Sequence, residues 1–158
     1  MQHRVRRYRG LFIGSFFDMI ENMIKFNEEK LKEAAKKYDL ADIYLFGSQI
    51  SGFAREDSDL DVGIRFSKGL PKEEQRGKLY GDIFSDLLPC FSREKIDLVF
   101  IDEVLLHFQF KIINDGQLIY SKNMENSMNF QEKIANYYRD YKYFIDEYFK
   151  GVLEFSTK

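Results

Sequence analysis

The chain has 158 residues whose charges nearly cancel, with 24 lysines and arginines against 26 aspartates and glutamates. That length fits one domain with a sizeable core, and the charge balance argues against a free-standing protein that binds nucleic acid directly. A single cysteine, Cys90, excludes an internal disulfide framework and a multi-cysteine zinc site. No apolar run reaches the roughly 20 residues that span a bilayer, so we expect a cytoplasmic protein with no membrane partner.

The N-terminus begins with a basic segment. Four arginines precede the apolar run Leu11 to Phe17, and this order resembles a small signal peptide. However, the run is short, Asp18 follows it, and no small-residue cleavage site is seen. We therefore expect residues 1–18 to be a loosely ordered basic arm, or an upstream start before a domain that begins at Met19 or Met23.

Helical periodicity and strand alternation predict a mixed α+β domain over residues 19–122, with one small mixed sheet and helices mainly on one of its faces. Pro71 suits a first helical position. In the helix that follows the third strand, Leu105, Phe108 and Ile112 are expected to point inward, and Gly116 to cap its end. The expected helices are 17–38, 48–54, 72–88, 103–114 and 126–155, and the expected strands are 43–46, 59–65, 96–101 and 118–120.

Residues 123–158 form a separate C-terminal unit, a long helix with an aromatic stripe. The segment contains five tyrosines, and four of them, Tyr137, Tyr138, Tyr141 and Tyr148, fall on the stripe at helical spacing. The stripe either packs on the sheet of the domain or presents its rings to a partner protein, because tyrosine is favoured at interfaces. The sequence leaves both roles open.

The stretch from Leu45 to Phe66 carries the chemistry. Asp59 and Asp61 lie two residues apart in an expected strand, so their side chains share one face. Two unpaired carboxylates at one point repel each other, and a hard divalent cation such as Mg²⁺ removes the conflict. Gly47 allows close approach of a phosphate to the backbone, and Ser48 offers a hydroxyl and exposed N–H groups.

A third carboxylate, Asp97, lies near the beginning of another alternating strand. If that strand neighbours the strand of Asp59 and Asp61, three carboxylates meet beside a phosphate cradle. This set is typical of two-metal phosphoryl or nucleotidyl transfer. A lone Asp-x-Asp or a lone Gly-Ser is common, but their combination in strand–turn–helix–turn–strand order indicates a nucleotide and metal site.

The pattern GSx10DxD after the apolar segment YLF, together with SDLDVGI and KIDLVFID, resembles the nucleotidyltransferase fold of the DNA polymerase β superfamily. More narrowly, it is similar to the minimal nucleotidyltransferases, the MntA-type antitoxins that are paired with HEPN-domain toxins. The resemblance covers about residues 30–122.

The resemblance implies a role for each matching residue. Gly47 and Ser48 match the pair that holds the triphosphate, and Asp59 and Asp61 match the metal-binding carboxylates. Asp97 matches the third carboxylate, which completes a metal site and helps to deprotonate the acceptor hydroxyl. The implied catalytic and metal set is therefore Asp59, Asp61 and Asp97, with two Mg²⁺ ions expected and ATP as the substrate.

The chain departs from the family pattern just before its second glycine. A small residue and an arginine often stand there, whereas this sequence has Ile50 and Ser51 before Gly52. A missing cation near the phosphates would weaken or alter nucleotide binding. Arg55 either compensates as a nucleotide-binding residue or is a solvated turn residue.

The sequence thus predicts an antitoxin that transfers AMP from ATP to a tyrosine of a HEPN RNase toxin, which silences the toxin. The chain has little beyond its catalytic sheet and a C-terminal helix, so the acceptor should arrive on another molecule. Two alternatives are a non-catalytic antitoxin that acts by binding alone and an aminoglycoside-type enzyme that modifies a small hydroxylated compound.

Overall fold

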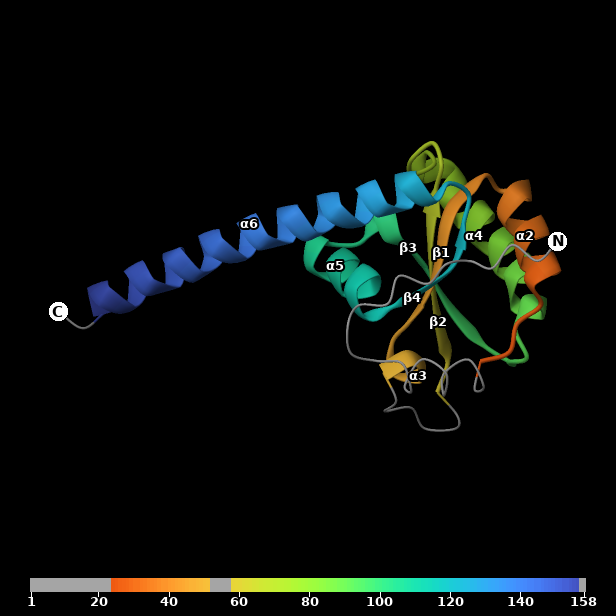
Figure 1. Ribbon diagram of the computed structural model, residues 1–158, viewed down its shortest axis with the longest axis horizontal. Helices are drawn as coiled ribbons and strands as arrows, with labels where there is room; N and C mark the ends of the chain where they lie inside the picture. Colours follow the sequence, from red (N-terminus) through yellow and green to blue (C-terminus); the bar gives the residue numbers. More distant parts are fainter. Residues whose placement is uncertain (1–23, 52–57, 157–158) are drawn as a thin grey trace.

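The computed structural model describes residues 24–51 and 58–156, in which one mixed four-stranded sheet has the order β3-β2-β1-β4 (Figure 1). β1 pairs antiparallel with β2 and β4, whereas β2 and β3 are parallel. The α+β prediction is confirmed. The strands are β1 (Leu40–Phe46), β2 (Leu60–Phe66), β3 (Ile96–Phe100) and β4 (Gln117–Ser121). The helices are α2 (Glu28–Lys37), α3 (Ser48–Ser51), α4 (Glu73–Leu87), η1 (Leu88–Cys90), η2 (Ile101–Glu103), α5 (Leu106–Asp115) and α6 (Met124–Ser156).

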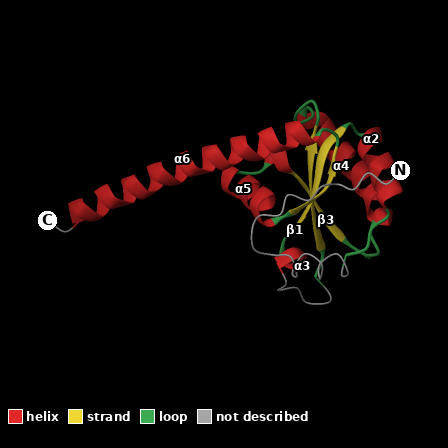
Figure 2. Cartoon of the chain, viewed as in Figure 1, coloured by secondary structure: helices red, strands yellow, loops and turns green. Residues whose placement is uncertain are grey.

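Different helices pack on the two faces of the sheet (Figure 2). The larger core packs α2 and α4 against one face, where the alternate β2 positions Leu60, Val62 and Ile64 are fully buried. A smaller core packs α5 against the other face, towards which Gly63 points. Helices therefore cover both faces, and the larger core lies on the face covered by α2 and α4, in line with the expectation of helices mainly on one face. Since side chains alternate along a strand, Asp61 lies on the α5 face.

The first described helix begins later than the periodicity predicts. Asn27 ends an extended segment, and its side-chain oxygen accepts a hydrogen bond from the Lys30 N–H at 3.0 Å. This N-cap fixes the start of α2 at Glu28. Phe26 instead forms a β-bridge with Phe91. The remainder of the expected helix start, residues 17–23, lies outside the described residues, as does the expected basic arm.

Three details around α4 and α5 correct the sequence-based expectations. Pro71 precedes α4, whose N-cap is Lys72. Leu105, expected to point inward, is 72% exposed because it precedes the first turn of α5, whereas Ile112 is fully buried as expected. Gly116 does end α5, with an extended φ of −83°. A Cβ there would lie 2.2 Å from the Ile112 carbonyl oxygen, so close packing, not a left-handed cap, requires the glycine.

A buried polar network fixes the foot of α6 to the α5 face of the sheet. Asp42 in β1 is completely buried and pairs with Arg65 in β2, with Nη2 to Oδ2 at 2.5 Å. The Ser127 hydroxyl of α6 donates to the other Asp42 carboxylate oxygen. The Arg65 guanidinium lies over the Phe130 ring, 4.4 Å from its centroid. These contacts tie α6 to two strands at once.

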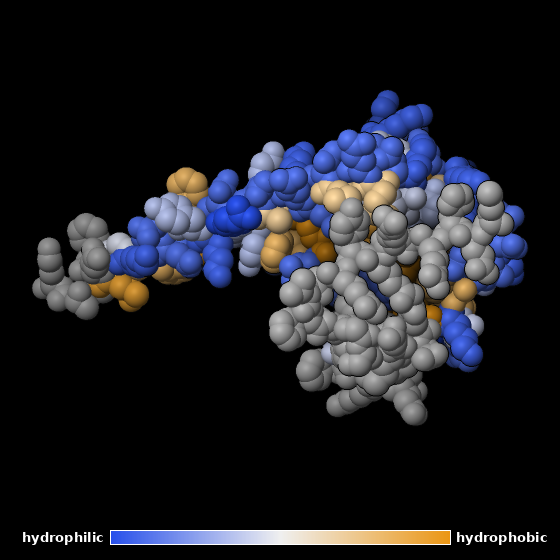
Figure 3. Space-filling model, in the orientation of Figure 1, coloured by the Kyte–Doolittle hydropathy of each residue, from blue (hydrophilic) through white to orange (hydrophobic). Residues whose placement is uncertain are grey.

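Beyond this foot, α6 projects away from the sheet as an arm (Figure 1). Tyr138 still stacks on Phe110 of α5, with ring centroids 4.1 Å apart. After that point apolar side chains alternate with hydrophilic ones on the surface of the arm (Figure 3). The domain thus packs only the first part of the aromatic stripe. The large apolar residues left exposed on the arm are Tyr141, Tyr143, Phe144, Tyr148, Phe149, Val152 and Leu153.

Candidate functional site

The turn after β1 packs against Asp61, the carboxylate of β2. Gly47 directly follows β1 and has φ +81°, a conformation that glycine adopts readily. A Cβ at this position would lie 1.9 Å from Asp61 Oδ2. Ser48 then begins α3, and the Gly47 carbonyl accepts the N–H groups of Ile50 and Ser51. The glycine is therefore required both by its own backbone and by the carboxylate that it touches.

The predicted adjacency of the carboxylate strands is present. β2 and β3 are parallel neighbours, and Asp61 is directly in register with Asp97. Asp59 immediately precedes β2 and is exposed. Partial burial raises the pKa of the Asp61 carboxyl, and the negative charges of Asp97 and Asp59 raise it further, while Lys111 of α5 acts in the opposite direction. The other two predicted carboxylates therefore both act electrostatically on Asp61.

The residues present fit a divalent cation that is shared with a nucleotide. Partial burial, and then the charges of Asp97 and Asp59, destabilise the Asp61 anion, and a bound cation would offset that penalty. Mg²⁺ commonly takes only one or two carboxylates, and completes its shell with water and substrate phosphates. Residues 24–51 and 58–156 hold no group of three or more Asp, Glu, His or Cys side chains that could hold a metal ion, and the metal-binding role of Asp59, Asp61 and Asp97 stays a prediction.

The two residues that depart from the family pattern, Ile50 and Ser51, lie in different environments. Ile50 is buried in the larger core, and Ser51 is exposed with its hydroxyl donating to the Ser48 carbonyl at 3.3 Å. Neither side chain carries a positive charge, so neither replaces the arginine that the family pattern often has there. Arg55, the predicted substitute, lies outside the described residues.

Three residues that the sequence reasoning missed lie around the site. Lys111 acts on Asp61 from α5. Gln49, buried in α3, accepts a hydrogen bond at 3.2 Å from Arg93, which precedes β3. No periodic pattern marks these positions, because their roles depend on how separate segments meet.

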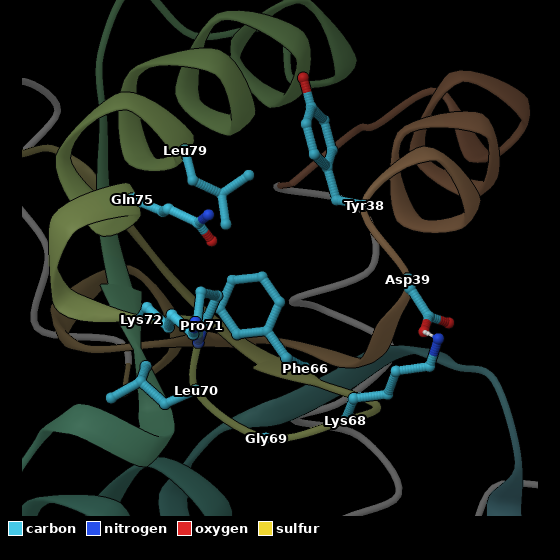
Figure 4. A pocket seen from close by; sticks show the side chains of 10 residues that line it. All are labelled: Tyr38, Asp39, Phe66, Lys68, Gly69, Leu70, Pro71, Lys72, Gln75 and Leu79. Atoms are coloured by element: carbon cyan, nitrogen blue, oxygen red, sulfur yellow. Dashed lines mark ion pairs between the residues drawn. The ribbon is translucent and has the colours of Figure 1, made fainter.

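A hollow of about 490 Å³ elsewhere on the molecule is distinct from this site (Figure 4). It is lined by Tyr38, Phe66 and Leu79, with Lys68 and Asp39 forming an ion pair at its rim. Phe66 ends β2, whereas Asp61 lies near its beginning, so strand geometry separates the two by roughly 16 Å. The hollow therefore contains none of the predicted site residues.

A glycine turn against two in-register carboxylates, on a sheet of this order, defines the nucleotidyltransferase class of fold. The family model described as polymerase beta, nucleotidyltransferase matches residues 29–125. The chain belongs to this family. No curated protein matches the sequence significantly.

Solved structures of toxin–antitoxin proteins share the fold. A toxin–antitoxin crystal structure with AMP-PNP is 20% identical, with 80% of this chain and 98% of that chain covered and a TM-score of 0.58. A tri-AMPylated HEPN toxin from Shewanella oneidensis in complex with its MNT antitoxin gives 18% identity, coverage of 80% and 95%, and a TM-score of 0.55. A MntA–HepT toxin–antitoxin structure gives 18% identity, coverage of 80% and 96%, and a TM-score of 0.55. In the described ranges, no helix of this chain is long and apolar enough to cross a membrane.

Proposed function

We propose that the chain is an antitoxin that transfers AMP from ATP to a tyrosine of a HEPN RNase toxin: the tyrosine oxygen bonds to the α-phosphorus, the bond between the α- and β-phosphates breaks, and pyrophosphate leaves. The observation that carries the proposal is the register of Asp61 with Asp97 beside the Gly47 turn. Family membership supports nucleotidyl transfer as the reaction class. The similar structures named for an AMP-PNP complex and for an AMPylated HEPN toxin support the donor and the acceptor.

Each residue of the site has a distinct task in this proposal. Gly47 brings its backbone against the carboxylates, so the phosphates can approach without a side chain in the way, and Ser48 offers its hydroxyl to them. Asp59, Asp61 and Asp97 hold the two Mg²⁺ ions that we expect with the nucleotide. When bound, such ions stabilise the charge that develops on the attacking and leaving oxygens. Asp97 also accepts the proton of the acceptor hydroxyl.

The arm of α6 supports a protein partner. Its exposed aromatic side chains do not pack on the domain, and aromatic residues are enriched at interfaces. We therefore keep residues 19–122 as the catalytic unit and residues 123–158 as the unit that joins domain and partner. The buried free thiol of Cys90 suits a reducing compartment, so we expect the reaction in the cytoplasm, where ATP is supplied.

One alternative is an antitoxin that acts by binding alone, which the exposed arm would also permit. The raised pKa of Asp61, which comes from its partial burial and from the nearby charges of Asp97 and Asp59, favours catalysis, because binding alone gives no reason to keep these anions close to a partly buried carboxylate. The other alternative, transfer to an aminoglycoside-type compound, needs a pocket for that compound. The hollow described above lies too far from Asp61 to provide it.

The test incubates the chain with labelled ATP, Mg²⁺ and a HEPN-domain protein encoded beside it. We expect the label on a toxin tyrosine, and its loss in Asp59→Ala and Asp61→Ala. Asp82→Ala is the matched control, because Asp82 is an exposed carboxylate on α4. Neutralisation that survives both site variants without any label would establish binding alone. Label on an aminoglycoside but never on protein would establish the small-molecule enzyme.

A further inference from the structure

Gln49 is a buried amide that connects three separate segments of the chain. Its side-chain nitrogen donates to the Ser58 carbonyl oxygen at 2.9 Å and to the Ser58 hydroxyl at 2.7 Å. Its side-chain oxygen accepts from Arg93 Nη2 at 3.2 Å. Gln49 is only 4% exposed, and these hydrogen bonds satisfy both ends of its amide.

The chemistry of the neighbours fixes the orientation of this amide. Arg93 carries only donors, so it must face the amide oxygen. The Ser58 carbonyl is only an acceptor, so it must face the amide nitrogen. A glutamate at position 49 would keep the contact with Arg93 but would turn an oxygen towards the Ser58 carbonyl. The site therefore requires a glutamine, and shape alone is not sufficient.

Each connected segment carries one part of the nucleotide site. Gln49 directly follows Ser48 in α3, Ser58 directly precedes Asp59, and Arg93 precedes the β3 strand of Asp97. β2 and β3 are held in register by the sheet. By contrast, Ser48 and Asp59 lie outside the strands, in α3 and just before β2. The Gln49 amide is the described link that joins these two ends directly.

We propose that Gln49 is a positioning residue for the nucleotide–metal site, and this inference rests on the proposed function. Its amide sets the distance between the phosphate turn at Ser48 and the first carboxylate at Asp59. Arg93 holds the amide from the other side. Loss of the amide should therefore weaken the binding of a cation that both the nucleotide and the carboxylates must reach. Removing groups that orient metal ligands typically weakens metal binding by about 10- to 100-fold.

The experiment measures binding of a non-hydrolysable ATP analogue by calorimetry at a series of Mg²⁺ concentrations, with urea unfolding of each variant alongside. Gln49→Leu keeps the volume of the side chain and removes the amide. Gln49→Glu keeps the acceptor for Arg93 and removes the donor to Ser58. Gln131→Leu is the matched control, because Gln131 donates one hydrogen bond of 2.9 Å to the Tyr44 hydroxyl at the foot of α6.

We expect Gln49→Leu and Gln49→Glu each to raise the Mg²⁺ concentration needed for half-maximal analogue binding by about 10-fold or more, and Gln131→Leu to leave it unchanged. A merely structural role for Gln49 predicts lower stability with the same Mg²⁺ requirement, and that result would overturn the inference. Gln49→Glu that binds like the unmodified chain would also overturn it. If the unmodified chain binds no analogue at any Mg²⁺ concentration, the proposed function itself fails.

Discussion

Replacing Gly47 by alanine should separate backbone strain from damage to the site, because the chain contains a matched glycine. Gly47 and Gly69 have nearly the same backbone conformation, with φ of +81° and +80°. A Cβ at Gly69 meets no atom within 4 Å, whereas a Cβ at Gly47 meets Asp61 Oδ2 at 1.9 Å, its Cγ at 2.7 Å and its Cβ at 3.3 Å. Both variants therefore carry the free-energy cost of a left-handed backbone, and only Gly47→Ala also carries the cost of a clash with Asp61.

The magnitudes follow from these contacts. A left-handed backbone costs a non-glycine residue about 1–2 kcal/mol, and the lower entropy of the unfolded chain offsets about 0.4–1 kcal/mol of that in both variants. Gly69→Ala should thus destabilise by about 1 kcal/mol. In Gly47→Ala the carboxylate, Cγ and Cβ of Asp61 must all move away from the new methyl group. This adds about 0.5–1.5 kcal/mol to the destabilisation if Asp61 adopts a strained rotamer. Displacement of a reacting group by about 1 Å can cost roughly 100-fold in rate.

Urea unfolding measures the first difference, and transfer of labelled AMP together with analogue binding measures the second. We expect Gly69→Ala to keep the activity of the unmodified chain, and Gly47→Ala to lose about 100-fold while remaining folded. Equal stability and full activity in both variants would contradict the close contact between Gly47 and the Asp61 side chain.

Other predictions concern the core and the foot of α6. Arg65→Met leaves the buried Asp42 without its cation and should cost about 3–5 kcal/mol in urea unfolding; a cost below 1 kcal/mol would contradict the ion pair as a buried contact. Ile112→Ala should cost about 2–5 kcal/mol, whereas Leu105→Ala should change stability by less than about 0.5 kcal/mol, and similar losses would place Leu105 in the core. Burial raises the pKa of Tyr44 from 10.0 to about 12. The contribution of the neutral phenol to the free energy of unfolding is therefore complete below pH 10 and is lost as the pH rises through 12. Tyr44→Phe should therefore lose less stability over that range, and parallel unfolding curves against pH would contradict the shift.

Alternation along the strands predicts where the carboxylates of the candidate site lie. The spacing of Asp59 and Asp61 predicts a shared face without any knowledge of the fold; Asp61 lies in β2 on the α5 face, as Gly63 does, whereas Asp59 lies just before the strand. The place of Asp97 depended on a condition, namely that its strand neighbours β2. Sequence pattern cannot decide that condition, because strand order follows from how the helices pack, and the structure meets it.

The remaining features depend on contacts between distant segments. Asp42 lies outside the expected strand 43–46, yet it is completely buried in β1 because Arg65 and Ser127 satisfy it. Leu105 fits a helical stripe but lies before the helix begins. Gln49 is one of the ten unspecified positions of GSx10DxD, and its hydrogen bonds to Ser58 and Arg93 indicate a role for it. Local pattern carries no information about such partners.

The attachment of α6 at one end gives the arm the mechanics of a lever. The helix has 33 residues, which corresponds to about 50 Å of length, and its contacts with the domain extend from Ser127 to Tyr138. The part beyond Tyr138 is about 27 Å long, so a tilt of about 5° there would move the far tip by roughly 2 Å. The pair formed by Asp42 and Arg65 sits on the same β1–β2 strands that carry Gly47 and Asp61 at their other ends. A sub-ångström shift in these strands would thus be multiplied at the tip, and a load on the tip would be felt in the strands.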